Sequence, residues 1–152
     1  MHQSGKGYSR DDIVKQVRSG ADSTIYNWST YIPIGNCVDK LHKWESQGVK
    51  IQYLTSRIKP SEIDDIRNVL KKYGFPGGQL FFRQKNEEYK DVAERVMPDI
   101  LIEDNCESIG GIEEMTYTYI RIDIKKKIKS IVVKEFEGVD HLPDDSENLR
   151  LL

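Results

Sequence analysis

The middle of the chain alternates between amphipathic segments and short apolar runs. Apolar residues spaced three and four apart predict helices over residues 36–48, 60–74 and 87–97. The apolar runs between these helices predict strands over residues 49–54, 79–82 and 100–102. Helices and strands that alternate in this order favour an α/β fold, with a parallel sheet and right-handed crossovers.

Further elements are expected on both sides of this alternation. Ser9 occupies the N-cap position of a helix over residues 10–18, and Pro33 excludes a helix through the end of the segment 23–34. Towards the C-terminus, the pattern predicts a short helix over 123–129 and a strand over 130–134. The polar segment that begins at His141 is expected to be mobile.

These elements predict a single domain over residues 1–143. Within it, residues 1–34 form a loop, a helix and a small cap-like segment, and residues 35–135 form the core. Residues 144–152 form an acidic C-terminal tail. The chain shows no internal repeat and no segment of low complexity.

Composition narrows the classes of function. The chain has 152 residues and a formal net charge of −2, so bulk charge attracts it neither to nucleic acid nor to membranes. The basic residues within 121–134 are expected to form a solvated face. Cys37 and Cys106 have the spacing of neither a metal site nor a disulfide framework. Reduced thiols in a cytoplasmic protein fit this usage, and a second copy of the chain is a candidate partner in a homodimer.

Polar side chains follow two of the predicted strands. Thr55 and Ser56 come after the first strand, and Glu103 and Asp104 come after the third. Ligands bind at the carboxyl ends of the strands in open α/β sheets. Lys90 lies near the start of the helix that leads into the third strand. Together these groups suit phosphoryl transfer. Hydroxyls and amides can hold phosphate oxygens, a lysine can offset the charge of those oxygens, and carboxylates can hold Mg²⁺.

Over residues 34–111 the chain resembles the haloacid dehalogenase (HAD) superfamily, whose members are mostly Mg²⁺-dependent phosphatases. Its second motif, a Thr or Ser that ends a strand, is matched by Thr55 in YLTSR, with Ser56 as a weaker candidate. Its third motif is a lysine, which Lys90 matches and for which Lys85 is the alternative. Its fourth motif is the acidic pair matched by Glu103 and Asp104. Since the family more often has Gly or Asp at the first of these positions, Asp104 is the safer magnesium ligand.

The resemblance implies a fold and a gap in that fold. It implies a three-layer parallel sheet of Rossmann-like type, whose central strand ends in Asp-x-Asp and carries the nucleophile and the general acid/base. No such run precedes Thr55, and the segment HQSGKGYSRDD looks like the loop that normally follows that strand. We therefore expect a chain that starts just downstream of its own nucleophile. The residues 24–32 or 130–134, or a strand from a second chain, are candidates to fill the central position.

Three functions follow from these expectations. The first is a HAD-type phosphoric monoester hydrolase acting on a small phosphorylated metabolite or nucleotide, inactive or weakly active as written. The second is a non-catalytic HAD-like module that binds phosphate or a partner protein. The third is an unrelated flavodoxin-like domain whose acids at the strand end are structural.

Overall fold

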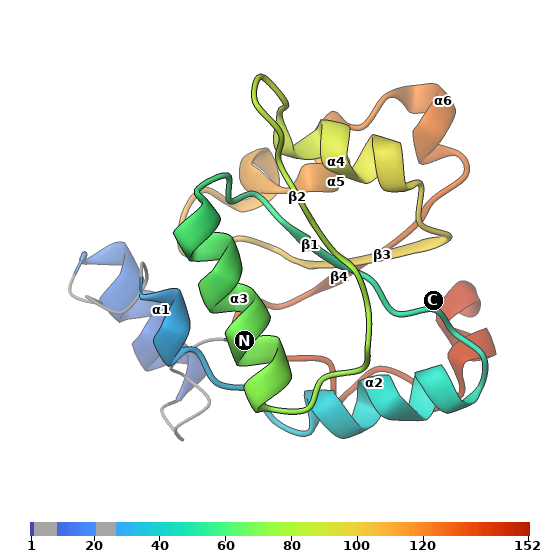
Figure 1. Cartoon of the computed structure of the whole chain (residues 1–152), viewed down its shortest axis with the longest axis horizontal. Helices are drawn as coiled ribbons and strands as arrows, with labels where there is room; N and C mark the ends of the chain where they lie inside the picture. Colours follow the sequence, from blue (N-terminus) through green and yellow to red (C-terminus); the bar gives the residue numbers. More distant parts are fainter. Residues whose placement is uncertain (2–8, 21–26) are drawn as a thin grey trace.

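Short parallel strands lie between helices in the computed structural model, which describes residues 1, 9–20 and 27–152 (Figure 1). The strands are β1 (Tyr53–Thr55), β2 (Leu80–Phe82), β3 (Ile100–Asp104) and β4 (Lys129–Val133). The α-helices are α1 (Arg10–Arg18), α2 (Cys37–Ser46), α3 (Pro60–Lys72), α4 (Tyr89–Val96), α5 (Thr116–Tyr119) and α6 (Ile122–Lys125). Three 3₁₀ turns complete the described elements: η2 (Trp28–Thr30), η3 (Gly111–Glu114) and η4 (Ser146–Leu151).

The longer helices are confirmed where local signals are strong. The Ser9 side chain accepts a hydrogen bond from the Asp12 amide and so caps α1. Pro60 occupies the first turn of α3, where its missing N–H removes no helical hydrogen bond. Helix α4 begins with a reciprocal capping box between Glu88 and Asp91. These caps explain why the predicted and observed helices differ by only a few residues at their ends.

The first strand is shorter than predicted and comprises only Tyr53–Thr55. Just before it, the chain passes very close to the loop that leads into β2. A Cβ atom built on Gly78 would lie 2.3 Å from the Ile51 carbonyl oxygen, so only glycine permits this approach. Regular pairing begins immediately afterwards, where the Tyr53 amide donates to the Gln79 carbonyl at 3.0 Å.

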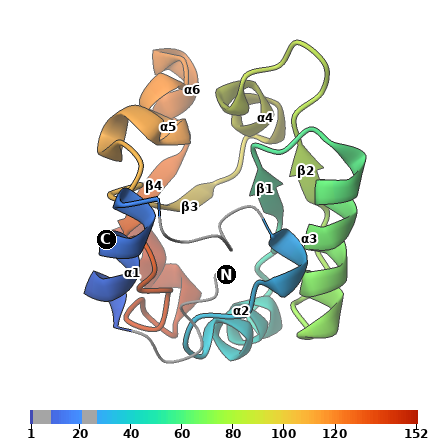
Figure 2. The same ribbon diagram turned by 90° about the vertical axis from the view of Figure 1, so that its left-hand side faces the viewer.

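The strands form two separate parallel pairs. β1 pairs with β2, and β3 pairs with β4. Figure 2 shows the order β4, β3, β1, β2 across the molecule. Among the described residues, no strand joins β3 to β1. The α/β class with parallel strands is therefore confirmed, and the described strands form two small sheets. The three-layer sheet lacking its central strand stays a prediction. The 130–134 candidate for the central position is wrong, because β4 pairs with the outer edge of β3; the 24–32 candidate lies partly outside the described residues.

Hydrophobic cores lie on both faces of β3, as its alternating side chains require. Ile100 and Ile102 pack against one core, and Leu101 belongs to the other. The first core contains Trp44, Ile131, Val133, Leu142 and Leu149. The second contains Ala93, Leu101, Ile120, Ile124 and Ile128, and Leu54 of β1 packs against it. Both cores therefore reach from the β3–β4 pair to residues in or next to β1.

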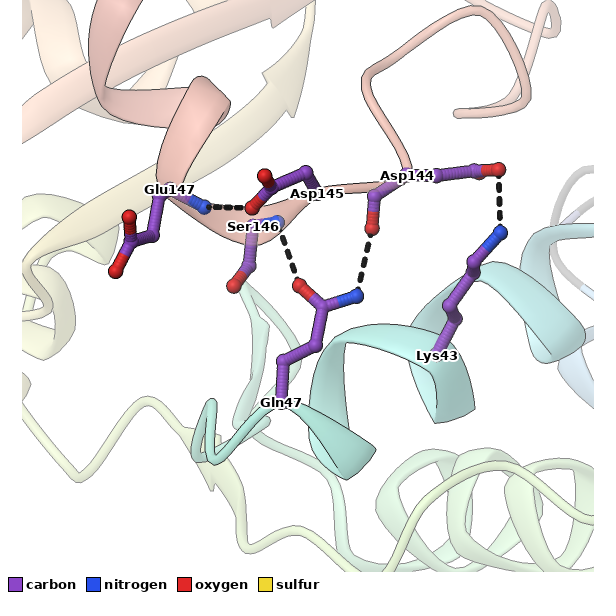
Figure 3. A pocket seen from close by; sticks show the side chains of 6 residues that line it. All are labelled: Lys43, Gln47, Asp144, Asp145, Ser146 and Glu147. Atoms are coloured by element: carbon purple, nitrogen blue, oxygen red, sulfur yellow. Dashed lines mark hydrogen bonds and ion pairs between the residues drawn. The ribbon is translucent and has the colours of Figure 1, made fainter.

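The expectation of a mobile C-terminal segment is wrong, because this segment is fixed to α2. Lys40 and Lys43 each place Nζ 2.5 Å from a carboxylate oxygen of Asp144. Gln47 donates to the Asp144 carbonyl at 2.9 Å and accepts from the Ser146 amide at 2.7 Å (Figure 3). Two of its leucines, Leu142 and Leu149, are buried in the first core, and their burial explains why the segment packs.

The Asp144 carboxylate makes the stability of this contact depend on pH. The ion pair with Lys40, and then that with Lys43, lowers the pKa of Asp144 to about 2. A lowered folded-state pKa stabilises the protein above the unfolded pKa of about 3.9, and this contribution is lost as the pH falls towards 2. We expect Asp144→Asn to lower Tm at pH 7 and to differ less and less from the wild type as the pH falls to about 2. A Tm difference that is the same at pH 7 and at about pH 2 would contradict this origin.

Candidate functional site

The carboxyl ends of all four strands lie on one side of the molecule. In Figure 1 the strands run from the right towards the left, where α1 lies. Thr55 is the last residue of β1 and Asp104 is the last residue of β3, so both are on this side. These are the two inner strands, which flank the break between the strand pairs. The structure thus brings the hydroxyl and carboxylate groups predicted as site residues to the same side.

The break leaves one edge of β1 without a strand partner among the described residues. Both main-chain groups of a residue in a parallel strand point to the same side, and the side alternates along the strand. Tyr53 pairs with the β2 side through its bond to Gln79. The N–H and C=O of Leu54 therefore point away from β2, towards β3.

The facing edge of β3 is arranged in the same way. The Asp99 carbonyl accepts from the Lys129 amide at 2.9 Å, and the Asn105 amide donates to the Val133 carbonyl at 2.9 Å. Odd-numbered residues of β3 therefore pair with β4. The main-chain groups of Ile100, Ile102 and Asp104 point towards β1. A parallel strand between β1 and β3 would satisfy both edges, and its side chains would enter the two cores.

The two acids at the end of β3 have different surroundings. Glu103 accepts hydrogen bonds from the amides of Thr116 and Tyr117, at 2.8 and 2.9 Å, and thereby caps α5. Burial raises the pKa of Glu103, and these amide bonds act in the opposite direction. Asp104 is exposed, and its Oδ1 accepts a hydrogen bond from the Cys106 amide at 2.8 Å. Asp104 is therefore the acid that presents a carboxylate oxygen to a ligand.

This donor set fits Mg²⁺ through one carboxylate. Mg²⁺ keeps several waters and commonly binds proteins through one or two carboxylates. Asp104 can supply one, whereas Glu103 would have to give up its bonds to α5 to supply another. No group of three or more His, Cys, Asp or Glu within residues 1, 9–20 and 27–152 could hold a metal ion by itself. Substrate oxygens and water would have to complete the coordination.

Lys90 lies in the first turn of α4, beside the segment that Glu103 caps. Its Nζ is 2.9 Å from Glu88 Oε2, and this ion pair raises the pKa of Lys90. Lys90 lines a hollow of about 270 Å³ together with Tyr89 and Thr116. The alternative, Lys85, is exposed in the loop before α4. The structure thus places Lys90 next to the α5 residues that the acidic pair contacts, but pairs it with Glu88.

Tyr89 is a neighbour of the acidic pair that sequence reasoning missed. Burial raises the pKa of its phenol, and the charges of Glu103 and Asp104 act in the same direction. In the sequence, Tyr89 lies on the apolar face of a predicted helix, and such a position is typical of a core residue. The phenol remains protonated at neutral pH and can therefore act as a hydrogen-bond donor at this site.

A buried glutamate holds the loop after Asp104, and this too was missed. Glu135 is 7% exposed and accepts from the amide and hydroxyl of Ser108, at 2.6 and 2.8 Å. Its own amide donates to Asn105 Oδ1 at 3.0 Å. Arg10 of α1 donates to the Glu135 carbonyl at 2.8 Å and forms an ion pair with Glu107. The loop that follows Asp104 is therefore fixed from both α1 and the end of β4.

Comparison of the chain with protein-family models, curated proteins and solved structures finds no match. No helix in the described part of the chain is long and apolar enough to cross a membrane. The functional argument therefore depends on the residues and geometry given above.

Proposed function

We propose that this chain is a HAD-like, Mg²⁺-dependent phosphatase domain that acts on a small phosphorylated metabolite or nucleotide. The observation that carries the proposal is the position of Thr55 and Asp104 at the carboxyl ends of the two strands that flank the break. In the proposed fold the sheet of a three-layer domain has the order β4, β3, central strand, β1, β2. The edges of β1 and β3 that have no strand partner among the described residues support this order, because their main-chain groups point towards the proposed central position.

Each residue has a proposed role in binding a phosphoryl group. The Thr55 hydroxyl and the amides of Thr55 and Ser56 hold its oxygens, and Ser56 can add its own hydroxyl. Lys90 leaves Glu88 and offsets the negative charge, with Lys85 as the alternative. Asp104 holds Mg²⁺. Glu103 either supplies a second carboxylate to the ion or supports the site indirectly by capping α5. When bound there, Mg²⁺ would supply Lewis-acid polarisation of a phosphoryl oxygen.

The chain as written is expected to hydrolyse phosphoesters very poorly. The sequence contains no Asp-x-Asp after an apolar strand, so it lacks the nucleophile and the general acid/base of the proposed mechanism. The same observation favours the alternative, a non-catalytic HAD-like module that binds phosphate or a partner. Phosphate binding is common to the phosphatase and to the phosphate-binding form of the module.

Phosphate binding can be tested without catalysis. We expect calorimetric titration with inorganic phosphate to give binding that is stronger with MgCl₂ than without it. Thr55→Ala should weaken this binding about tenfold, since hydrogen bonds to charged groups contribute about 1.5–3 kcal/mol. Asp104→Asn should abolish the effect of Mg²⁺.

Matched substitutions control for charge and stability. Thr118→Ala and Asp145→Asn make the same changes at other positions and should leave phosphate binding unchanged. Absence of phosphate binding by the wild type, or equal binding by wild type and Thr55→Ala, would overturn the proposed site. Near-background hydrolysis of p-nitrophenyl phosphate by the wild type is expected; full activity would show that another group is the nucleophile.

A further inference from the structure

Arg57 lies two residues after the end of β1, and both its main-chain amide and its main-chain carbonyl form hydrogen bonds. Its amide donates to the Thr55 hydroxyl oxygen at 3.3 Å. Its carbonyl accepts from the Arg83 amide, also at 3.3 Å, and this ties it to the chain after β2. Arg57 is therefore fixed within two residues of Thr55, on the side of the molecule where the strands end.

The guanidinium of Arg57 is stacked on an aromatic ring. Its Cζ lies 4.4 Å from the ring centroid of Trp28, in η2. Such stacking attracts the cation to the face of the ring and leaves the edge of the guanidinium available. The edge carries N–H groups in a planar fork that matches two oxygens of a phosphate.

Arg57 differs from three cations near this side of the molecule that are paired with carboxylates. Lys90 is paired with Glu88, Arg95 with Glu87, and Arg10 with Glu107. The Arg57 guanidinium has no hydrogen bond and no ion pair with any residue in the described part of the chain, although Arg57 is only partly exposed. A partly buried cation without an anionic partner is stabilised by an anion that reaches it. Its place next to Thr55 indicates which anion that is.

We propose that Arg57 is a further phosphate-binding residue of this site and that Trp28 positions it. This inference rests on the proposed function and names the cation that meets the phosphoryl group from the β1 side. The Thr55 hydroxyl and the Arg57 fork bind oxygens of the same phosphate. The fork is in place before the ligand arrives, whereas Lys90 must first leave Glu88.

The test uses the full chain, inorganic phosphate and MgCl₂, with calorimetric titration. We expect Arg57→Gln to weaken phosphate binding about tenfold or more, as for the loss of a charge-assisted bidentate contact. Arg57→Lys should recover only part of this loss, because an ammonium group does not present a planar fork. Arg150→Gln, which removes the same charge from η4, should bind phosphate as the wild type does.

The role of Trp28 has a separate readout. Trp28→Phe should weaken binding a few-fold, because Phe attracts a cation less strongly than Trp. In the Arg57→Gln background the same substitution should have no effect. An equal effect in both backgrounds would show that Trp28 acts on the fold and not through Arg57.

The outcomes separate this inference from the proposed function. If Thr55→Ala weakens binding and Arg57→Gln does not, the phosphate site stands and the role of Arg57 is overturned. If the wild type binds no phosphate, both are overturned. Thermal unfolding of each variant identifies any loss of binding that comes from unfolding, and Arg57→Lys then provides the decisive comparison.

Discussion

Extending the chain at Met1 by an apolar strand that ends in Asp-x-Asp-Gly-Thr is expected to produce a Mg²⁺-dependent phosphatase. The strand would pair with Leu54 on one side and with Ile100 and Ile102 on the other, and its apolar side chains would enter both cores. Its first aspartate would lie between Thr55 and Asp104. We expect hydrolysis of p-nitrophenyl phosphate at least about a hundredfold faster than by the unextended chain, the smallest factor that a positioned acid/base supplies.

A second extension separates pairing from chemistry. The same strand with both aspartates changed to asparagine should stabilise the domain equally, because each apolar side chain that becomes fully buried contributes about 1.5–3 kcal/mol. It should show no turnover. If neither extension raises Tm, the gap between β1 and β3 does not accept a strand. If both raise Tm and neither hydrolyses the ester, the non-catalytic module is favoured.

Trp44→Ala is expected to give the largest loss of stability. Trp44 is 2% exposed at the centre of the first core, and its indole N–H donates to the Pro143 carbonyl at 2.9 Å. Truncation of a buried Trp to Ala costs about 3–5 kcal/mol, which is a large part of the 5–15 kcal/mol that stabilises a typical domain. The free energy of unfolding from urea titration measures this loss.

Trp44→Phe is the graded comparison for this prediction. It keeps an aromatic ring in the core and removes the hydrogen bond to Pro143, so it should cost about 1–2 kcal/mol. Both variants should increase proteolysis of the chain after His141, because Trp44 holds that segment against α2. A loss below 1 kcal/mol for Trp44→Ala would mean that the C-terminal segment contributes little to the core.

Local signals in the sequence were sufficient to predict the longer helices. The Ser9 cap, Pro60 in a first helical turn and the apolar spacing of α2 and α3 act over a few residues, so no tertiary information is needed. The order of strands and helices likewise followed from the alternation of patterns. The predicted strand ends at residues 54 and 102 lie within two residues of the observed ends at Thr55 and Asp104 for the same reason.

Long-range contacts account for what the sequence did not predict. The docking of the C-terminal segment depends on Asp144 meeting Lys40 and Lys43, about a hundred residues earlier. The role of Glu103 as a cap for α5 required knowing that Thr116 returns to the end of β3. In the sequence, Glu135 is one more charged residue after an apolar strand, and only the fold shows that it is buried. Such partners leave no periodic signal in the sequence.

The central claim is that Thr55 and Asp104, on separate strands, act on one Mg²⁺-bound phosphate. A double-mutant cycle of Thr55→Ala and Asp104→Asn, measured as the free energy of inorganic phosphate binding with MgCl₂, tests it most directly. If a single ligand joins the two residues, the combined loss should differ from the sum of the single losses by more than about 0.5 kcal/mol. Additive losses, or no loss in either variant, would contradict a shared site.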